Sequence, residues 1–134
     1  MMNLCPCCSG KLYKDCCQPY HDNKDFPKTA LQLMRSRYAA YALNLSDYII
    51  KTTHISNPCY NTDKDMWRKE IESFSKEFIF EKLKVVSFEE DGNVATVTFT
   101  AYLSQDGEDR SFSEKSFFEK VNGRWFYRDG VILK

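Results

Sequence analysis

Several features that would point to particular protein classes are missing from this sequence of 134 residues. Its 19 basic and 19 acidic residues give a formal net charge of zero, without the charge excess that favours nucleic acid or a membrane surface. No stretch approaches the roughly 20 apolar residues of a membrane helix. The first residues also lack the basic region, apolar run and cleavage site of a signal peptide. We therefore expect a cytoplasmic protein without membrane association, and nucleic acid is a disfavoured partner.

Common catalytic signatures are missing as well. The sequence has no Ser-His-Asp order, no phosphate-binding glycine loop and no paired carboxylate motif, and it contains no repeat, low-complexity tract or long linker. Hydrophobic residues nevertheless make up 43% of the chain and aromatic residues 15%, which is enough for a packed core. A chain of this length suits one ordinary domain with a small appendage.

Cysteine, in contrast, is concentrated near the start of the chain, where five of the six cysteines fall within residues 5–17. Clustered cysteines in a reducing compartment are more often metal ligands or redox groups than disulfides. Two pairs, Cys5 with Cys7 and Cys16 with Cys17, supply the four soft ligands that tetrahedral zinc prefers. Metal binding also supplies folding free energy, on the order of 10–16 kcal/mol in small zinc modules, to segments too short to fold on apolar burial. The cluster predicts a metal site, with a vicinal disulfide or redox relay at Cys16 and Cys17 as the alternative.

Four residues near this cluster, and Cys59 farther along the chain, have less specific roles. Cys8 is a fifth thiol that can replace a neighbouring ligand, whereas Cys59 stands alone and is expected to be a small buried residue or an inert surface thiol. Lys11 and Lys14 can offset the charge of four thiolates. His21 is a group supporting the ligands, a substitute ligand, or simply an exposed linker residue.

The middle of the chain predicts three helices. Thr29 followed by Gln32 is a capping box, and apolar residues then recur at helical spacing. A short second helix is expected to begin at a Ser46 cap, and a third at a Thr62 cap. The expected apolar stripes of the first and third helices are Leu31, Met34, Tyr38, Tyr41 and Leu45, and Trp67, Ile71, Phe74 and Phe78.

The second half predicts strands, because β-branched and apolar residues alternate with period two around residues 93–104. Asp-Gly or Asn-Gly pairs, which tolerate hairpin turns, separate successive runs. The strands are expected near 79–89, 93–104, 110–121 and 124–133. Helices followed by an antiparallel meander predict an α+β domain, with about three helices on one face of a curved four-stranded sheet. Such a sheet closes over the helices as a cone, whose mouth is a natural ligand pocket.

The segment "CPCCSGKLYKDCCQPYH" resembles the SEC-C motif, the zinc-binding segment at the C-terminus of the SecA translocation motor and in many other bacterial proteins. The resemblance implies that Cys5, Cys7, Cys16 and Cys17 bind zinc, and Cys8 stands where the family has glycine. It also implies a structural zinc segment that presents a surface to a protein partner. The SecA partners include a chaperone and the ribosome, so the implied contact is with protein-export or translation machinery.

A second resemblance covers almost the whole chain. "LMRSRYAAYALNLSDYIIKTTH" and "SFFEKVNGRWFYRDG" are similar to the YchJ family of uncharacterised bacterial proteins. The resemblance implies a zinc segment over residues 1–21 and a domain resembling nuclear transport factor 2, a cone-shaped α+β sandwich, over residues 22–134. The family brings no established reaction, so the residues alone must indicate whether the chain is an enzyme. Cones of this kind often pair through the open sheet face, which makes a homodimer an expectation.

Several residues are candidates for chemistry in the cone pocket. A histidine is a candidate general base, an arginine can bind a carboxylate or phosphate through two hydrogen bonds, and a tyrosine can donate to an oxyanion. The candidates are His54, Arg35, Arg37, Tyr38, Tyr41, Tyr127 and Asp129.

Each candidate also has a purely structural interpretation. His54 can cap a helix or touch solvent, and the two arginines can lie over the core and pair with Glu114 or Asp129. The helical tyrosines have core spacing, and Asp129-Gly130 is most simply a turn.

Three functional hypotheses follow. The first is a protein-interaction module built on the zinc segment. The second is a small-molecule enzyme or ligand-binding protein that uses the cone pocket with His54 and Arg35. The third, nucleic-acid binding through Lys11, Tyr13 and Lys14, has the least support.

Overall fold

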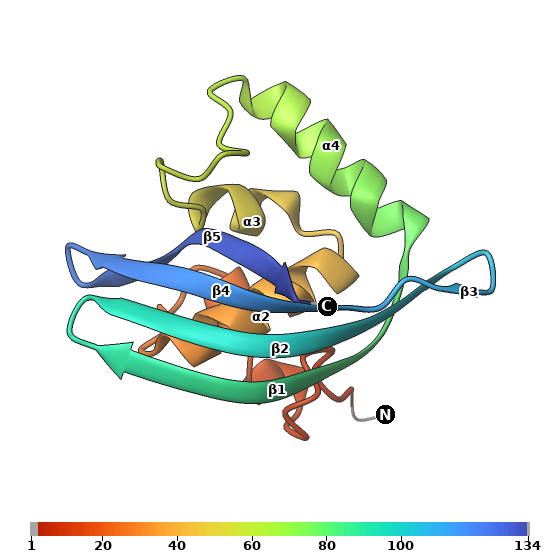
Figure 1. Cartoon of the computed structure of the whole chain (residues 1–134), viewed down its shortest axis with the longest axis horizontal. Coiled ribbons are helices and arrows are strands. Elements are labelled where there is room, and N and C mark those ends of the chain that lie inside the picture. The colour runs from red at the N-terminus through yellow and green to blue at the C-terminus, as the bar shows by residue number, and fades with distance from the viewer. Residues whose placement is uncertain (1–2, 134) are drawn as a thin grey trace.

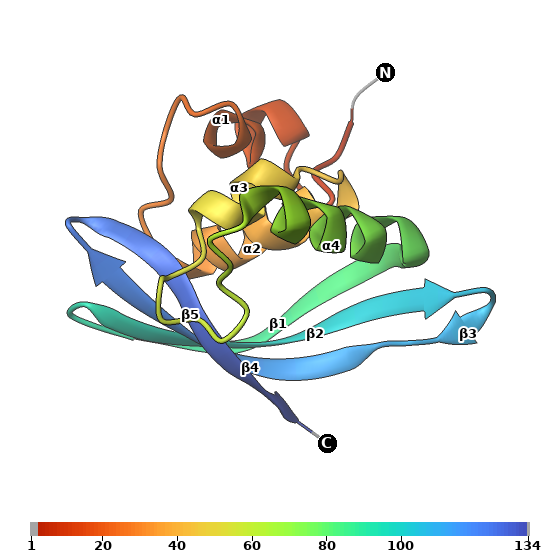
Figure 2. The ribbon, with the colours of Figure 1, turned by 90° about the horizontal axis from the view of Figure 1, so that it is seen from above.

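Three layers make up the structure, a computed structural model that describes residues 3–133. A curved antiparallel sheet carries the helices on one face, and the N-terminal segment lies on the far side of those helices (Figures 1 and 2). The predicted ranges 1–21 and 22–134 include residues 1, 2 and 134, which lie outside the described residues. The helices are η1 (Tyr13–Asp15, 3-10), α1 (Gln18–His21), α2 (Ala30–Ala42), α3 (Ser46–Lys51) and α4 (Lys64–Glu77).

Helix α2 is the central element because it is covered on two sides. Thr29 caps it by accepting a hydrogen bond from the Gln32 N–H at 3.1 Å, as the capping box predicts. Leu33 packs toward the sheet in the main core, whereas Ala39 packs against the cysteines of the N-terminal segment. Both residues are fully buried. Small residues such as Ala39 let the two layers approach the helix closely.

The predicted caps of the other two helices were wrong by one residue. Ser46 lies inside α3 and donates instead to the Glu72 carboxylate at 3.1 Å. Helix α4 is capped by Asp63, whose Oδ1 accepts from the Met66 N–H at 3.1 Å, and not by Thr62. Asparagine, aspartate, serine and threonine are all competent caps, so the choice depends on where the buried stripe starts.

The sheet confirms the predicted antiparallel meander and adds one short strand. Its main strands are β1 (Ile79–Asp91), β2 (Val94–Gln105), β4 (Phe112–Val121) and β5 (Arg124–Leu133), hydrogen-bonded in that order. The added strand, β3 (Glu108–Asp109), pairs with β2. Glycines with positive φ lie at the three hairpin turns, as the Asp-Gly and Asn-Gly pairs predicted. Alternate residues of β2, including Val97 and Phe99, are buried against the helices.

A β-bulge in β5 decides which of its side chains face the helices. Phe118 pairs with Tyr127 and Phe117 pairs with Asp129, so Arg128 is the extra residue. Tyr127 therefore packs against the buried core, whereas Asp129 shares the opposite face with Phe117. The interpretation of Asp129-Gly130 as a turn was wrong, because both residues lie within β5.

The free edge of β5 is partly covered by the chain that follows α3. The Tyr127 N–H donates to the Thr52 carbonyl at 2.9 Å, and the His54 N–H donates to the Tyr127 carbonyl at 2.8 Å. These bonds hold the loop before α4 against the sheet. Within residues 3–133, no helix is long and apolar enough to cross a membrane.

The start of α4 gives a direct test of this local structure. Replacing Asp63 by alanine removes the cap and is expected to lower the free energy of unfolding by about 1 kcal/mol. Thr62→Ala is the matched control and is expected to leave stability nearly unchanged, since Asp63 supplies the observed cap. Urea denaturation of both variants measures the difference; equal losses would place the cap at Thr62.

Candidate metal centre and ligand cavity

Four cysteines of the N-terminal segment converge on one point. The Sγ atoms of Cys5, Cys7, Cys16 and Cys17 all lie within 4.8 Å of one another. Cys16 Sγ is 3.6 Å from Cys7 Sγ and 3.8 Å from Cys17 Sγ. A tetrahedral ion with metal–sulfur bonds of about 2.3 Å holds its sulfurs about 3.8 Å apart. The cluster therefore fits a tetrahedral metal ion, and none of the cysteines is in a disulfide.

The electrostatics of the cluster also favour a bound cation. Hydrogen bonds from Cys17 and Cys5 lower the pKa of Cys7, so one thiol of the group ionises readily. The hydrogen bonds of Cys17 to Cys5 and Cys7, together with burial, raise its own pKa. Each thiolate in the cluster therefore makes ionisation of the next thiol less favourable. A bound cation would offset the repulsion among four thiolates.

A tight backbone hairpin brings the first two cysteines into position. The Cys5 N–H donates to the Lys11 carbonyl at 2.9 Å, and Leu4 bridges to Leu12. The hairpin turns through two residues in the left-handed region, Cys8 at φ 65° and Gly10 at φ 86°. Cys8 therefore adopts a left-handed backbone conformation, which glycine adopts at lower cost than cysteine. Its side chain lies outside the four-cysteine cluster.

Three contacts dock this segment on the rest of the chain. Arg35 of α2 donates from Nη1 to the Cys7 carbonyl at 2.7 Å. The Leu83 N–H of β1 donates to Cys8 Sγ at 3.4 Å. His21 connects through its ring to the Ser36 carbonyl. The segment is therefore fastened to both the helix layer and the sheet.

His21 is a structural anchor and not the exposed linker residue that was one expectation. Its Nε2 donates to the Ser36 carbonyl at 2.8 Å, which leaves Nδ1 to accept from the Tyr13 hydroxyl at 2.6 Å. Burial lowers the pKa of His21, in agreement with this neutral form. Because both ring nitrogens are engaged, His21 is not placed to bind the metal.

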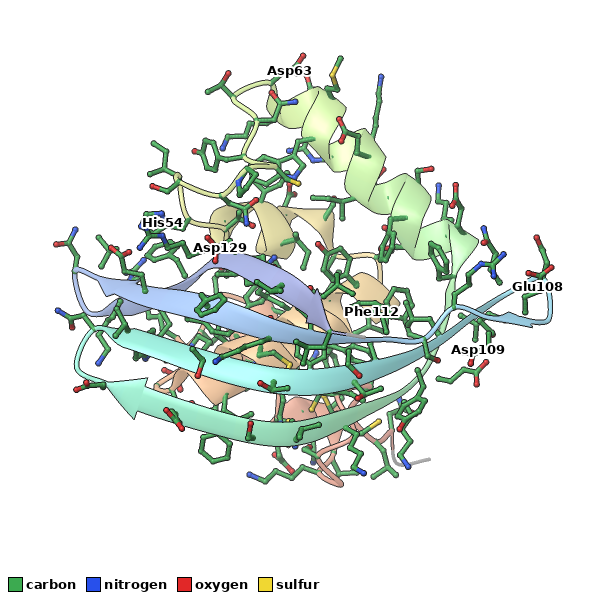
Figure 3. All side chains as sticks on the ribbon, viewed as in Figure 1. His54, Asp63, Glu108, Asp109, Phe112 and Asp129 are labelled. Atoms are coloured by element: carbon green, nitrogen blue, oxygen red, sulfur yellow. The ribbon has the colours of Figure 1, made fainter. Side chains whose placement is uncertain are left out.

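A cavity of about 390 Å³ lies between α2, α4 and the sheet. Figure 3 shows Phe112, one of its lining residues, between β4 and α4. Its walls are largely aromatic and include Phe74, Phe80 and Phe99. The volume falls within the range of small-molecule sites in proteins. Cys59 and Glu70 also line the cavity and are exposed, so the cavity opens beside the loop before α4.

A charged network crosses this apolar wall. The Arg37 side chain is only 8% exposed, and its guanidinium lies 4.6 Å from the centre of the Tyr127 ring. The Tyr127 hydroxyl donates to Glu114 Oε2 at 2.9 Å, and the Ser116 hydroxyl donates to the same oxygen. Burial and the Glu114 charge raise the pKa of Tyr127, so this phenol remains a donor at neutral pH.

Gly130 makes room for this network. A Cβ atom at Gly130 would lie closer than 3.0 Å to both the Glu114 carboxylate and the Tyr127 hydroxyl. The glycine thus permits two side chains to rest against the β5 backbone, which explains its place inside a strand.

Four sequence candidates line the cavity together: Arg37, Tyr38, Tyr41 and Tyr127. The other three do not. Arg35 faces the cysteine segment on the opposite side of α2, and the β5 bulge turns Asp129 to the outer sheet face.

His54 lies at the far end of β5 from Phe112, in a separate hollow of about 280 Å³ (Figure 3). Its Nε2 is 3.5 Å from Glu119 Oε2, and its Nδ1 accepts from the Ser56 N–H at 3.0 Å. The expectation that His54 and Arg35 share the cone pocket is therefore corrected, since neither lines the main cavity. The structure also corrects the expected pairing of the arginines with Glu114 or Asp129, because both bind backbone carbonyls instead.

Two polar residues of β4 that line the cavity were not predicted as part of the site. Glu114 was considered only as an ion-pair partner, and Ser116 was not considered. Both alternate with Phe112 and Phe118 on the inward face of β4. A carboxylate at an inward strand position between two phenylalanines is the signal that could have identified Glu114.

Comparison with known proteins follows the same two-part division. The model for "YchJ, middle NTF2-like domain" matches residues 29–130, and the model for the SEC-C motif matches residues 3–19. A UPF0225 protein of Vibrio parahaemolyticus is 40% identical over 98% of this chain and 77% of its own length. One from Actinobacillus succinogenes is 36% identical over 98% of this chain and 84% of its own length.

Solved structures show the same architecture. The solution structure of RPA3114, an SEC-C motif containing protein from Rhodopseudomonas palustris, is 35% identical and covers all of both chains with a TM-score of 0.83. The crystal structure of an SEC-C motif containing protein from Psychrobacter arcticus is 32% identical, covers 97% of this chain and 82% of its own, and has a TM-score of 0.76. An LEH-like epoxide hydrolase from M. tuberculosis, at 16% identity over 80% of this chain and 86% of its own with a TM-score of 0.57, shares the fold alone.

Arg35 gives a test of how the cysteine segment is held. Arg35→Met removes a charged hydrogen bond to Cys7 and is expected to cost about 1.5–3 kcal/mol of stability. Amide hydrogen exchange should accelerate within residues 5–17 while the strand amides stay protected. Arg110→Met, which removes only surface contacts near β3, is the control and should leave exchange in the segment unchanged. Unchanged exchange in Arg35→Met would contradict the anchoring role.

Proposed function

Because this chain belongs to the YchJ family and carries its SEC-C motif, we propose that it is a zinc protein whose cone-shaped domain binds a small organic ligand. The zinc has a structural role, and the cavity is the functional site. The observation that carries the proposal is the network of the buried Arg37 with the half-buried Tyr127 and Glu114 in the wall of an aromatic cavity.

Zinc is the metal that the donor set favours. Four sulfur ligands in a tetrahedron select zinc or an iron–sulfur centre among biological metals. Four protein ligands leave no open coordination position, which is typical of structural zinc and not of catalytic zinc. Cys5, Cys7 and Cys17 are buried, so the ion would form the core of the N-terminal segment.

The cavity supports ligand binding better than a purely structural role. A domain selected only for stability would gain by filling this space with apolar side chains, because the aromatic walls would then be buried instead of facing an open cavity. Burying charged groups in an apolar wall is also costly unless they are paired. A bound ligand would offset both costs, because it would fill the cavity and pair with the charged groups.

Two expectations concerning partners remain proposals. A protein partner on the zinc segment is supported by an apolar and a basic side chain on its surface. Leu4 is 66% exposed, and Lys11 is exposed as well. A homodimer through the outer sheet face is supported by exposed apolar residues such as Val94 and Val131. A cytoplasmic location agrees with four reduced cysteines in one cluster.

The zinc proposal predicts the metal content of the protein. Native mass spectrometry under reducing conditions should show one zinc ion per chain in the wild type and in Cys59→Ser. Cys7→Ser should lose the ion and unfold residues 5–17, because the metal is their core. Cys8→Ser should retain it, since Cys8 lies outside the cluster. A zinc-free wild type, or zinc loss on replacing Cys8 alone, would contradict the assignment.

The cavity proposal predicts binding of a neutral aromatic probe. N-phenyl-1-naphthylamine should become fluorescent on binding to the wild type, and Ala101→Leu should abolish the signal by filling the buried wall. Thr98→Leu, three residues earlier on the other face of β2, is the matched control and should bind normally. Thermal unfolding checks that both variants are folded. Equal binding by both variants would place the probe outside the cavity.

A further inference from the structure

The cavity wall contains two opposite charges that can hold a polar group of a ligand. Arg37 and Glu114 both line the cavity and contact Tyr127, Arg37 over its ring and Glu114 at its hydroxyl. No ion pair within 4.0 Å joins either charge to a partner among residues 3–133. The positive and the negative group therefore contact the same tyrosine side chain and form no ion pair with each other.

Arg37 has hydrogen-bonding capacity left over. Its Nη1 donates to the Ile49 carbonyl at 3.1 Å and to the hydroxyls of Thr52 and Thr53 at 2.8 and 3.1 Å. Its other two nitrogens make no hydrogen bond to the described part of the chain, although a guanidinium has five N–H donors. The fixed Nη1 orients the group, and the remaining donors are available to an acceptor in the cavity.

Glu114 has a hydrogen-bond acceptor left over. Oε2 accepts from Tyr127 and Ser116, whereas Oε1 has no hydrogen-bond partner within residues 3–133. A carboxylate can only accept, so Oε1 requires a donor. Tyr127 cannot serve both oxygens, because its single proton is already committed to Oε2.

We propose that the ligand carries an apolar body and a head group with an acceptor and a donor on neighbouring atoms, as in a primary carboxamide. The acceptor binds Arg37 and the donor binds Glu114, while the body lies among the aromatic walls. This inference rests on the proposed function of the cavity. A hydrocarbon would leave both charges unpaired, and a carboxylate would satisfy Arg37 but place a second negative charge near Glu114.

Three naphthalene compounds of nearly equal shape test this assignment: 2-naphthamide, 2-acetylnaphthalene and 2-naphthoate. Each competes with N-phenyl-1-naphthylamine for the wild type. The amide should displace the probe at about tenfold lower concentration than the ketone, because the ketone lacks the donor to a charged acceptor. The carboxylate should also require about tenfold more than the amide.

Glu114→Gln supplies the decisive variant. Its amide oxygen can take the place of Oε2 and keep accepting from Tyr127 and Ser116, in which orientation its NH₂ replaces Oε1 and is a donor. The amide should then lose its advantage over the ketone, and 2-naphthoate should become the tightest of the three. Melting temperature and zinc content verify the fold. Should this variant not fold, Tyr127→Phe is the substitute: it removes the hydrogen bond that orients the Glu114 carboxylate and keeps the ring beneath Arg37. The amide's advantage should then fall, because Oε1 is no longer held in place for the donor.

The outcomes separate the two proposals. Probe binding with equal competition by all three compounds would overturn the head-group assignment and leave the cavity function standing. The tightest wild-type binding by 2-naphthoate would also overturn it, in favour of an anion on Arg37 alone. Loss of probe binding itself would overturn both. An unchanged order of the three compounds in Glu114→Gln would contradict the role of Glu114.

Discussion

The rest of the structure depends on α2, a helix buried between the sheet and the cysteine segment. Successive helical residues are rotated by about 100°, so Arg35 and Arg37 point to opposite sides. Arg35 binds the backbone of Cys7, and Arg37 lies in the cavity wall. Two arginines separated by one residue thus serve the metal segment and the ligand cavity respectively.

This arrangement assigns complementary roles to the two parts of the chain. The cysteine segment has almost no apolar core of its own; it is stabilised by its contacts with α2 and would gain further stability from a metal ion held by its four cysteines. In return, it covers the side of α2 that would otherwise expose Ala39 and the Ser36 carbonyl. The four-cysteine cluster, although it lies on the other side of α2 from the cavity, therefore still supports the cavity wall, because both pack on the same helix.

Much of this could be predicted from the sequence wherever one local signal decided the outcome. Thr29 with Gln32 fixed the start of α2, strand periodicity fixed β2, and cysteine spacing predicted the four-sulfur cluster. The composition of the site could not be predicted with the same success. A single extra residue at Arg128 turns Asp129 away from the cavity, and no sequence pattern marks that bulge. The role of Gly130 likewise depends on two side chains brought to it by the fold.

The most direct measurement of the central claim is a nitrogen-edited NMR titration of the zinc-loaded protein with N-phenyl-1-naphthylamine. The account predicts that the amide signals of Ala101, Ser116 and Tyr127 shift in a saturable manner, because these residues line the cavity. The signals of Cys5 and Cys17 should stay in place, since the metal segment lies on the other side of α2. Shifts confined to the cysteine segment or to the outer sheet face would contradict it.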